Sequence, residues 1–172
     1  GHKITTLKPS LVPLECHEGW CTEAQGLSLR NVKITVEDTV NHRDIYEDMG
    51  EMIFTHYGIS GPMVLSASSH MRNMEKGRYK IHIDFKPALT YEQLDKRIQR
   101  DLLECSNKNL YNTLSLLLPR KMIPITVKLT KLNGNLKSNQ VTKEMRGELV
   151  DFLKTTNVSP ERINGLLESK GT

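Results

Sequence analysis

The residues best suited to chemistry lie in one short run of the chain, Gly50–Pro62, with the sequence GEMIFTHYGISGP. An apolar stretch, then glycines, then a proline predict a strand, a tight turn and a helix that Pro62 opens. The first turn of such a helix has backbone N–H groups without helical partners, which can bind an anion or the polar edge of a cofactor. An ordinary strand-to-helix turn explains the same pattern and is the commoner structure.

His56 lies just before this turn and titrates near neutral pH when unperturbed, so it could donate a proton. A histidine at the end of a strand needs no such role, and the sequence identifies no partner for it. Within the turn, Ser60 is a candidate helix cap and Gly61 would allow a ligand to approach the backbone closely.

The other reactive residues form no complete motif. Cys16, His17 and Cys21 have the spacing C-x4-C without a second pair, whereas structural zinc needs four paired ligands, so we predict no metal site. A hairpin loop through Glu18–Trp20 explains the cluster more simply. The chain has no GxGxxG, no phosphate-binding loop and no GxSxG motif, which suggests that it is a piece of a larger enzyme.

Composition limits the function further. The 172 residues include 24 Lys and Arg against 20 Asp and Glu, a net charge of +4, with 37% hydrophobic residues. There is no secretory signal and no apolar run of the roughly 20 residues that span a membrane, and three cysteines suit reduced thiols. We therefore expect a cytoplasmic globular protein with no membrane partner.

The charge also argues against nucleic acid as a partner, because basic residues are interleaved with acids along the chain. A basic patch could still form on the helical part, although a solvated helix surface is the simpler explanation. Its candidate residues are Arg97, Arg100, Lys108, Arg120 and Lys121.

The first half of the chain has the alternation of strands. Apolar and polar residues alternate over 79–85 and 32–37, and the alternation breaks at Arg30–Asn31, which predicts a bulge. The residue types of Asp48–Glu51 predict a hairpin turn. Several short antiparallel strands favour a barrel or a sandwich, and 157–167 could return as a last strand.

The second half has helical periodicity. Thr90 and Gln93 form a capping box for a helix that contains Leu94, Ile98 and Leu102. Two shorter helices are expected over 110–118, ended by Pro119, and over 122–132, and a fourth with Thr142 as its N-cap. These helices predict a bundle from about 90 to 156.

Four segments carry a resemblance to a known family. Residues 1–14, 26–32, 50–62 and, more weakly, 117–121 resemble the insert domain of the YhiN/BaiN-like flavoproteins, which are also called aminoacetone oxidase family FAD-binding enzymes or NAD(P)/FAD-dependent oxidoreductases. In that family the insert is a β-barrel with a small helical bundle and interrupts the FAD domain. The resemblance implies an α+β fold, an antiparallel β-barrel with an inserted small α-helical bundle, divided into a β-barrel module (1–88 and 157–172) and a helical bundle (89–156).

The resemblance also implies a function. The chain would be the substrate-side cap of an FAD-dependent, NAD(P)H-linked oxidoreductase, inactive alone and without cofactor of its own, because the FAD-binding segments of the parent chain are absent. Its partners would be the FAD-binding domain of that parent and a small-molecule substrate. His56 would orient the substrate or donate a proton. The residues expected to face the flavin are Thr55, Gly58, Ser60, Gly61 and Pro62, with Pro9, Ser10 and Pro13 as further candidates.

A second hypothesis is a stand-alone module that binds RNA or protein. Such a module predicts a clustered basic face and exposed aromatic rings. The chain has three Phe, five Tyr and one Trp and no RNP-like run, so the flavoprotein hypothesis is favoured.

Overall fold

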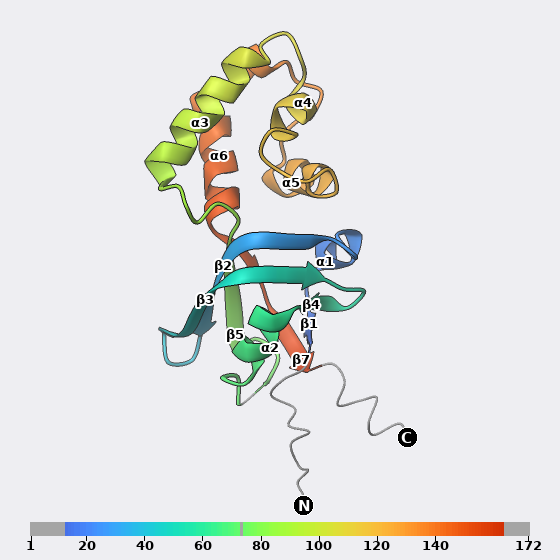
Figure 1. The fold of residues 1–172 in the computed structure, drawn as a ribbon, viewed down its shortest axis with the longest axis vertical. Helices are drawn as coiled ribbons and strands as arrows, with labels where there is room; N and C mark the ends of the chain where they lie inside the picture. The colour runs from blue at the N-terminus through green and yellow to red at the C-terminus, as the bar shows by residue number, and fades with distance from the viewer. Residues whose placement is uncertain (1–12, 73, 164–172) are drawn as a thin grey trace, which may run out of the picture. The chain divides into compact units, whose positions relative to one another are not determined.

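The computed structural model describes residues 13–72 and 74–163 (Figure 1). The chain forms two compact units. The first unit consists of the described residues up to Ile83 and from Asn157 onward, and the second unit consists of Asp84–Thr156. The first unit is built on a sheet and the second is helical, so the fold is α+β. Within the described residues, no helix is long and apolar enough to cross a membrane.

A seven-stranded antiparallel sheet forms the first unit, with the order β6-β5-β2-β3-β4-β1-β7. Two short helices accompany it, α1 (Trp20–Glu23) and α2 (Pro62–Ser68), and α2 packs against β3. The strands are β1 (Leu14–Cys16), β2 (Ser28–Asp38), β3 (Arg43–Phe54), β4 (Gly58–Ser60), β5 (Tyr79–Asp84), β6 (Thr156–Val158) and β7 (Pro160–Ile163). Because α1 begins at Trp20, the expected hairpin loop through Glu18–Trp20 is wrong.

The alternating residues form strands as predicted. Val32, Ile34 and Val36 of β2 and Ile81 and Ile83 of β5 are all buried, and the polar residues between them are more exposed. The pairing of β2 with β3 shifts register between Leu29 and Val32, which confirms the bulge predicted at Arg30–Asn31.

The predicted hairpin turn at Asp48–Glu51 is wrong. These residues lie inside β3, where Asp48 pairs with Ile34 and Gly50 with Val32. The turn between β2 and β3 instead follows Asp38, and His42 adopts a left-handed backbone conformation there, with φ of 54°. The residue types at 48–51 are tolerated in the strand because most of their side chains lie on an exposed face.

The expected barrel is also corrected, because the described sheet does not close on itself. β6 and β7 follow one another along the chain but occupy opposite edges of the sheet. Ser159 connects them: its N–H donates to Glu18 Oε1 (2.7 Å) and its carbonyl accepts from the His17 N–H (2.9 Å). Ser159 is the only residue between the two strands, which is too short a connection for a hairpin, so β6 and β7 do not pair with each other in the described sheet.

The helical unit follows its sequence signals closely. Its helices are α3 (Tyr91–Glu104), α4 (Leu110–Leu114), α5 (Met122–Thr130), the 3₁₀ turn η3 (Ser138–Gln140) and α6 (Lys143–Lys154). The capping box is confirmed: the Gln93 N–H donates to Thr90 Oγ1 (3.1 Å) and the Thr90 N–H to Gln93 Oε1 (2.9 Å). Thr142 caps α6 as expected, whereas α4 ends four residues before the predicted Leu118.

Asp38 holds the β2–β3 turn in place. Its carboxylate accepts hydrogen bonds from the backbone N–H groups of Val40 (3.0 Å) and Asn41 (3.3 Å), and from Arg78 Nη2 (3.0 Å) just before β5. Burial of Asp38 raises the pKa of its carboxyl, but the bonds from Arg78, Asn41 and Val40 outweigh burial and bring the pKa down to about 2. The charged carboxylate therefore joins the turn to the start of a third strand.

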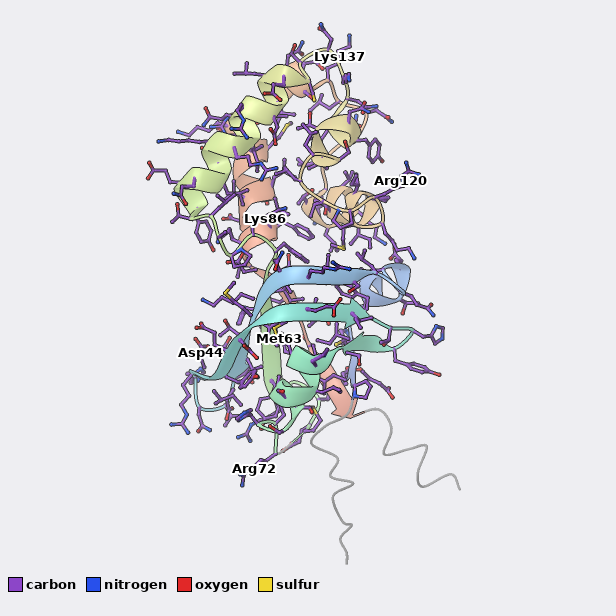
Figure 2. All side chains as sticks on the ribbon, viewed as in Figure 1. Asp44, Met63, Arg72, Lys86, Arg120 and Lys137 are labelled. Carbon is purple, nitrogen blue, oxygen red and sulfur yellow. The ribbon has the colours of Figure 1, made fainter. Side chains whose placement is uncertain are left out.

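We predict that Asp38→Asn lowers the thermal unfolding temperature at neutral pH, because the amide cannot replace the carboxylate between Arg78 and the turn. An unfolded aspartate has a pKa of about 3.9. The stabilisation should therefore be complete above that pH and disappear as the pH falls toward 2, so that the variant and the parent converge. Circular dichroism melts across this range test the prediction. The exposed Asp44, labelled in Figure 2, provides the control variant Asp44→Asn, and an equal effect there would contradict it.

Candidate functional site

The predicted site lies where β3 turns into β4. The Thr55 N–H donates to the Gly58 carbonyl (2.9 Å), and the Gly58 N–H donates to Thr55 Oγ1 (3.0 Å). The Thr55 hydroxyl also accepts a longer bond from the Tyr57 N–H (3.3 Å). Thr55 thus serves the turn itself, and the turn projects the two residues at its apex, His56 and Tyr57.

The apex combines an imidazole with a phenol. Both side chains are exposed, Tyr57 by 56%, and their rings meet edge to face with centroids 4.8 Å apart. His56 Nδ1 lies 3.4 Å from Gln25 Oε1, and the His56 carbonyl accepts a bond from Thr22 Oγ1 (3.0 Å). Such a group of side chains can exchange a proton with a bound molecule and donate hydrogen bonds to it.

Three members of this group were not predicted. Tyr57 lies within the run Gly50–Pro62, next to His56, and its phenol can form hydrogen bonds, so its position in the sequence could have identified it as a candidate. Gln25 and Thr22 are about 30 residues from His56 in sequence, and only the fold brings them to the turn. No local pattern could have identified these two.

Gly58 is buried against the first strand. A Cβ atom at this position would lie 2.1 Å from the Leu14 carbonyl oxygen and 2.8 Å from the Cys16 nitrogen. β4 and β1 pair here, and the Cys16 N–H donates to the Tyr57 carbonyl (3.0 Å). The absence of a side chain at Gly58 is therefore what allows β1 to support the turn from behind.

The remaining predicted residues lie at the other end of β4. Gly61, not Ser60, is the N-cap of α2 and has φ of 110°, and no side chain caps this helix, so the expected capping role of Ser60 is wrong. Ser60 instead pairs with Ile53 of β3. Pro62 occupies the start of α2, as predicted, and is exposed.

The structure thus divides the predicted residues between two places. Thr55, His56 and Gly58 belong to the turn, whereas Gly61 and Pro62 follow after β4, about 10 Å along an extended strand. α2 has only seven residues, so its dipole alone is a weak attraction for an anion. The turn is the part that presents reactive side chains.

The cysteines nearest this turn are free thiols. Cys21 is buried, and its hydrogen bond with Cys16, together with burial, raises the pKa of the Cys16 thiol. His17 points elsewhere, with Nδ1 3.1 Å from Glu161 Oε2. Among the described residues, no group of three or more His, Cys, Asp or Glu side chains could hold a metal ion.

A separate hollow of about 270 Å³ lies within the helical unit. It contains none of the predicted site residues. Its lining combines apolar side chains with amides, hydroxyls and one guanidinium, and these side chains do not place a nucleophile beside a base. The lining residues are Gln99, Leu102, Leu103, Ser106, Ser138, Asn139, Val141 and Arg146.

Comparison with known proteins shows both a family and a curated relative that match most of the chain. The family described as "HI0933-like protein barrel and H2TH domain" matches residues 8–170. A 3-dehydro-bile acid delta(4,6)-reductase from Clostridium scindens is 27% identical over 167 residues, which cover 96% of this chain and 40% of the relative. The chain therefore spans less than half the length of that curated relative.

We predict that Gly58→Ala destabilises the first unit by about 2 kcal/mol or more, because the new methyl group would overlap the backbone of β1. Urea unfolding followed by the fluorescence of Trp20, which is buried in the same unit, measures the change. Gly19→Ala is the matched control, since no atom lies within 4 Å of a Cβ placed there. Equal stabilities for the two variants would show that β4 can move away from β1 at little cost.

Proposed function

Because this chain belongs to the HI0933-like family, as its resemblance to the YhiN/BaiN-like flavoproteins predicted, we propose that it is the substrate-side cap of an FAD-dependent oxidoreductase. The family is FAD-dependent. The observation that carries the proposal is the β3–β4 turn, which presents His56 and Tyr57 to solvent over a rigid strand pair. We infer that an FAD-binding domain of the same parent chain is the main partner.

The glycines of the site do not form a cradle for the phosphates of FAD. The space beside Gly58 is filled by the backbone of β1, and a Cβ at Gly61 would lie 3.2 Å from the Glu51 carbonyl oxygen. Close approach of a pyrophosphate needs this space to be open. The turn fits the edge of a flavin ring or the substrate beside it, and the cofactor itself would be held by the FAD-binding domain.

The chemistry assigned to the turn is proton supply. FAD provides hydride transfer when bound, with NAD(P)H as the proposed electron source. Reduction of a substrate consumes a proton as well as a hydride. Gln25 Oε1 lies at Nδ1 of His56, so the protonated imidazole would keep its Nδ1 proton on Gln25 and give its Nε2 proton to the substrate, which leaves neutral imidazole. Tyr57 packs against the edge of the imidazole and restricts its rotation.

The substrate class follows from the same argument. The relative is named as a reductase of a bile acid, and we extend only its reaction type to this protein, the reduction of a small molecule. An exposed imidazole and phenol suit a substrate with a polar group near the reduced atom. The free cysteines suit a reducing compartment such as the cytoplasm.

The proposal predicts that His56→Gln slows one half of the catalytic cycle. In the protein that joins this chain to its FAD-binding domain, reoxidation of the reduced flavin by substrate should fall about 100-fold, which is the usual contribution of a general acid. Reduction of the flavin by NAD(P)H needs no proton from His56 and should keep its rate. Stopped-flow absorbance of the flavin measures both steps separately.

His42→Asn is the control, because His42 is exposed in the β2–β3 turn and asparagine tolerates its left-handed backbone. This variant should leave both rates unchanged. Unchanged reoxidation in His56→Gln would remove His56 from the mechanism. A parent protein that binds no flavin would refute the cap function as a whole.

A further inference from the structure

The helical unit distributes its charge unevenly. Between Cys105 and Lys143 there are seven lysines and arginines and no aspartate or glutamate, although an even spread of the chain's 20 acids would place four or five there. We call this stretch the basic segment. Its cationic residues are Lys108, Arg120, Lys121, Lys128, Lys131, Lys137 and Lys143, and all seven are exposed.

Several cations elsewhere in the same unit have carboxylate partners. Lys96 pairs with Glu92 (3.3 Å), and Arg146 pairs with Asp95 (2.6 Å), whose pKa is lowered chiefly by that bond. Lys154 likewise lies 2.8 Å from Asp84. In the part of the chain that the structure describes, four cations of the basic segment have no carboxylate partner: Lys108, Arg120, Lys131 and Lys137.

The fold brings the two ends of the basic segment together. The Ser138 N–H donates to the Lys108 carbonyl (2.8 Å), and Asn109 forms a β-bridge with Lys137, so the backbones of Lys108 and Lys137 run side by side. Figure 2 shows Lys137 near the end of this unit where α3 ends, and Arg120 beside α4 and α5. Two of the unpaired cations, Lys108 and Lys137, are therefore neighbours.

An exposed aromatic ring stands on the same segment. Tyr111 packs against Gly134, where a Cβ atom would lie 2.2 Å from Cζ of the ring, and the Tyr111 N–H donates to the Gly134 carbonyl (3.1 Å). The residue is nevertheless 38% exposed. The basic segment also contains exposed asparagines: Asn107, Asn112, Asn133, Asn135 and Asn139.

We propose that the basic segment binds single-stranded nucleic acid, with its cations on the phosphates and a base stacked on Tyr111. Cations without internal partners lose no ion pair when they bind phosphate, and their release of counterions supplies affinity. An exposed aromatic ring beside these cations can stack on a base of a single strand, whereas the bases of a duplex are already stacked on one another. This function goes beyond the proposed oxidoreductase and is independent of flavin. The low net charge of the whole chain does not reveal the basic segment, because all of the aspartates and glutamates lie outside it.

The first test measures the fluorescence anisotropy of a labelled oligonucleotide, about 16 nucleotides long, with the full chain. Binding should weaken steeply as salt rises from about 50 to 200 mM. Lys108→Gln/Lys137→Gln should weaken binding at least about fivefold and reduce the salt slope by about 1.4, the value for two phosphate contacts on a single strand. Circular dichroism verifies that the variant is folded.

The control removes the same charge from elsewhere. Lys76→Gln/Lys96→Gln replaces two lysines whose side chains are 77% and 73% exposed and lie outside the basic segment. Its affinity should stay within about twofold of the parent, because neither lysine is placed to contact the strand. Equal losses in the two double variants, or no salt-dependent binding by the parent, would overturn the proposal.

Tyr111→Leu distinguishes nucleic acid from polyanions in general. Loss of stacking should weaken binding of single-stranded RNA or DNA at least about fivefold and leave binding of heparin unchanged. Equal effects on heparin and on the oligonucleotides, or equally tight binding of a duplex, would show that the segment attracts any polyanion and would refute a single-strand site. Comparison of RNA with DNA then identifies which of the two is preferred.

Discussion

The close contact between β4 and β1 is the constraint on which the first unit depends. β1 has only three residues, yet it pairs with β4 on one side and with β7 on the other. The contact requires that residue 58 have no side chain, because the backbone of β1 occupies the space a Cβ would need. The reactive turn is thus positioned by backbone packing behind it, and the side chains of His56 and Tyr57 stay exposed.

This dependence explains which features the sequence could predict. Local signals were sufficient for β2, β5, the bulge at Arg30–Asn31 and the caps Thr90 and Thr142, because each reports on neighbouring residues alone. The position of the β2–β3 turn was not predictable from residue types, since pairing across the whole hairpin overrides the turn propensity of Asp48–Glu51. The link at the junction of β6 and β7 joins Ser159 to Glu18, which are 141 residues apart, so no local pattern could reveal it.

The candidate site was predictable to the same extent. The run Gly50–Pro62 predicted a turn and a helix start together, but the structure separates the two, and the fold adds Gln25 and Thr22 to the turn. The basic segment presents the opposite case. The sequence alone shows that the segment lacks acids, whereas only the structure shows that, among the described residues, Lys108, Arg120, Lys131 and Lys137 have no carboxylate partner.

The open sheet has a consequence for how the protein behaves at high concentration. A sheet with two free edges offers unpaired backbone groups to neighbouring molecules, and long edge strands promote edge-to-edge aggregation. Here the edges belong to β6 and β7, which have three and four residues, and Pro160 interrupts the N–H groups where they meet. In the described part of the chain, the short edge strands therefore limit intermolecular strand addition although the sheet does not close into a ring.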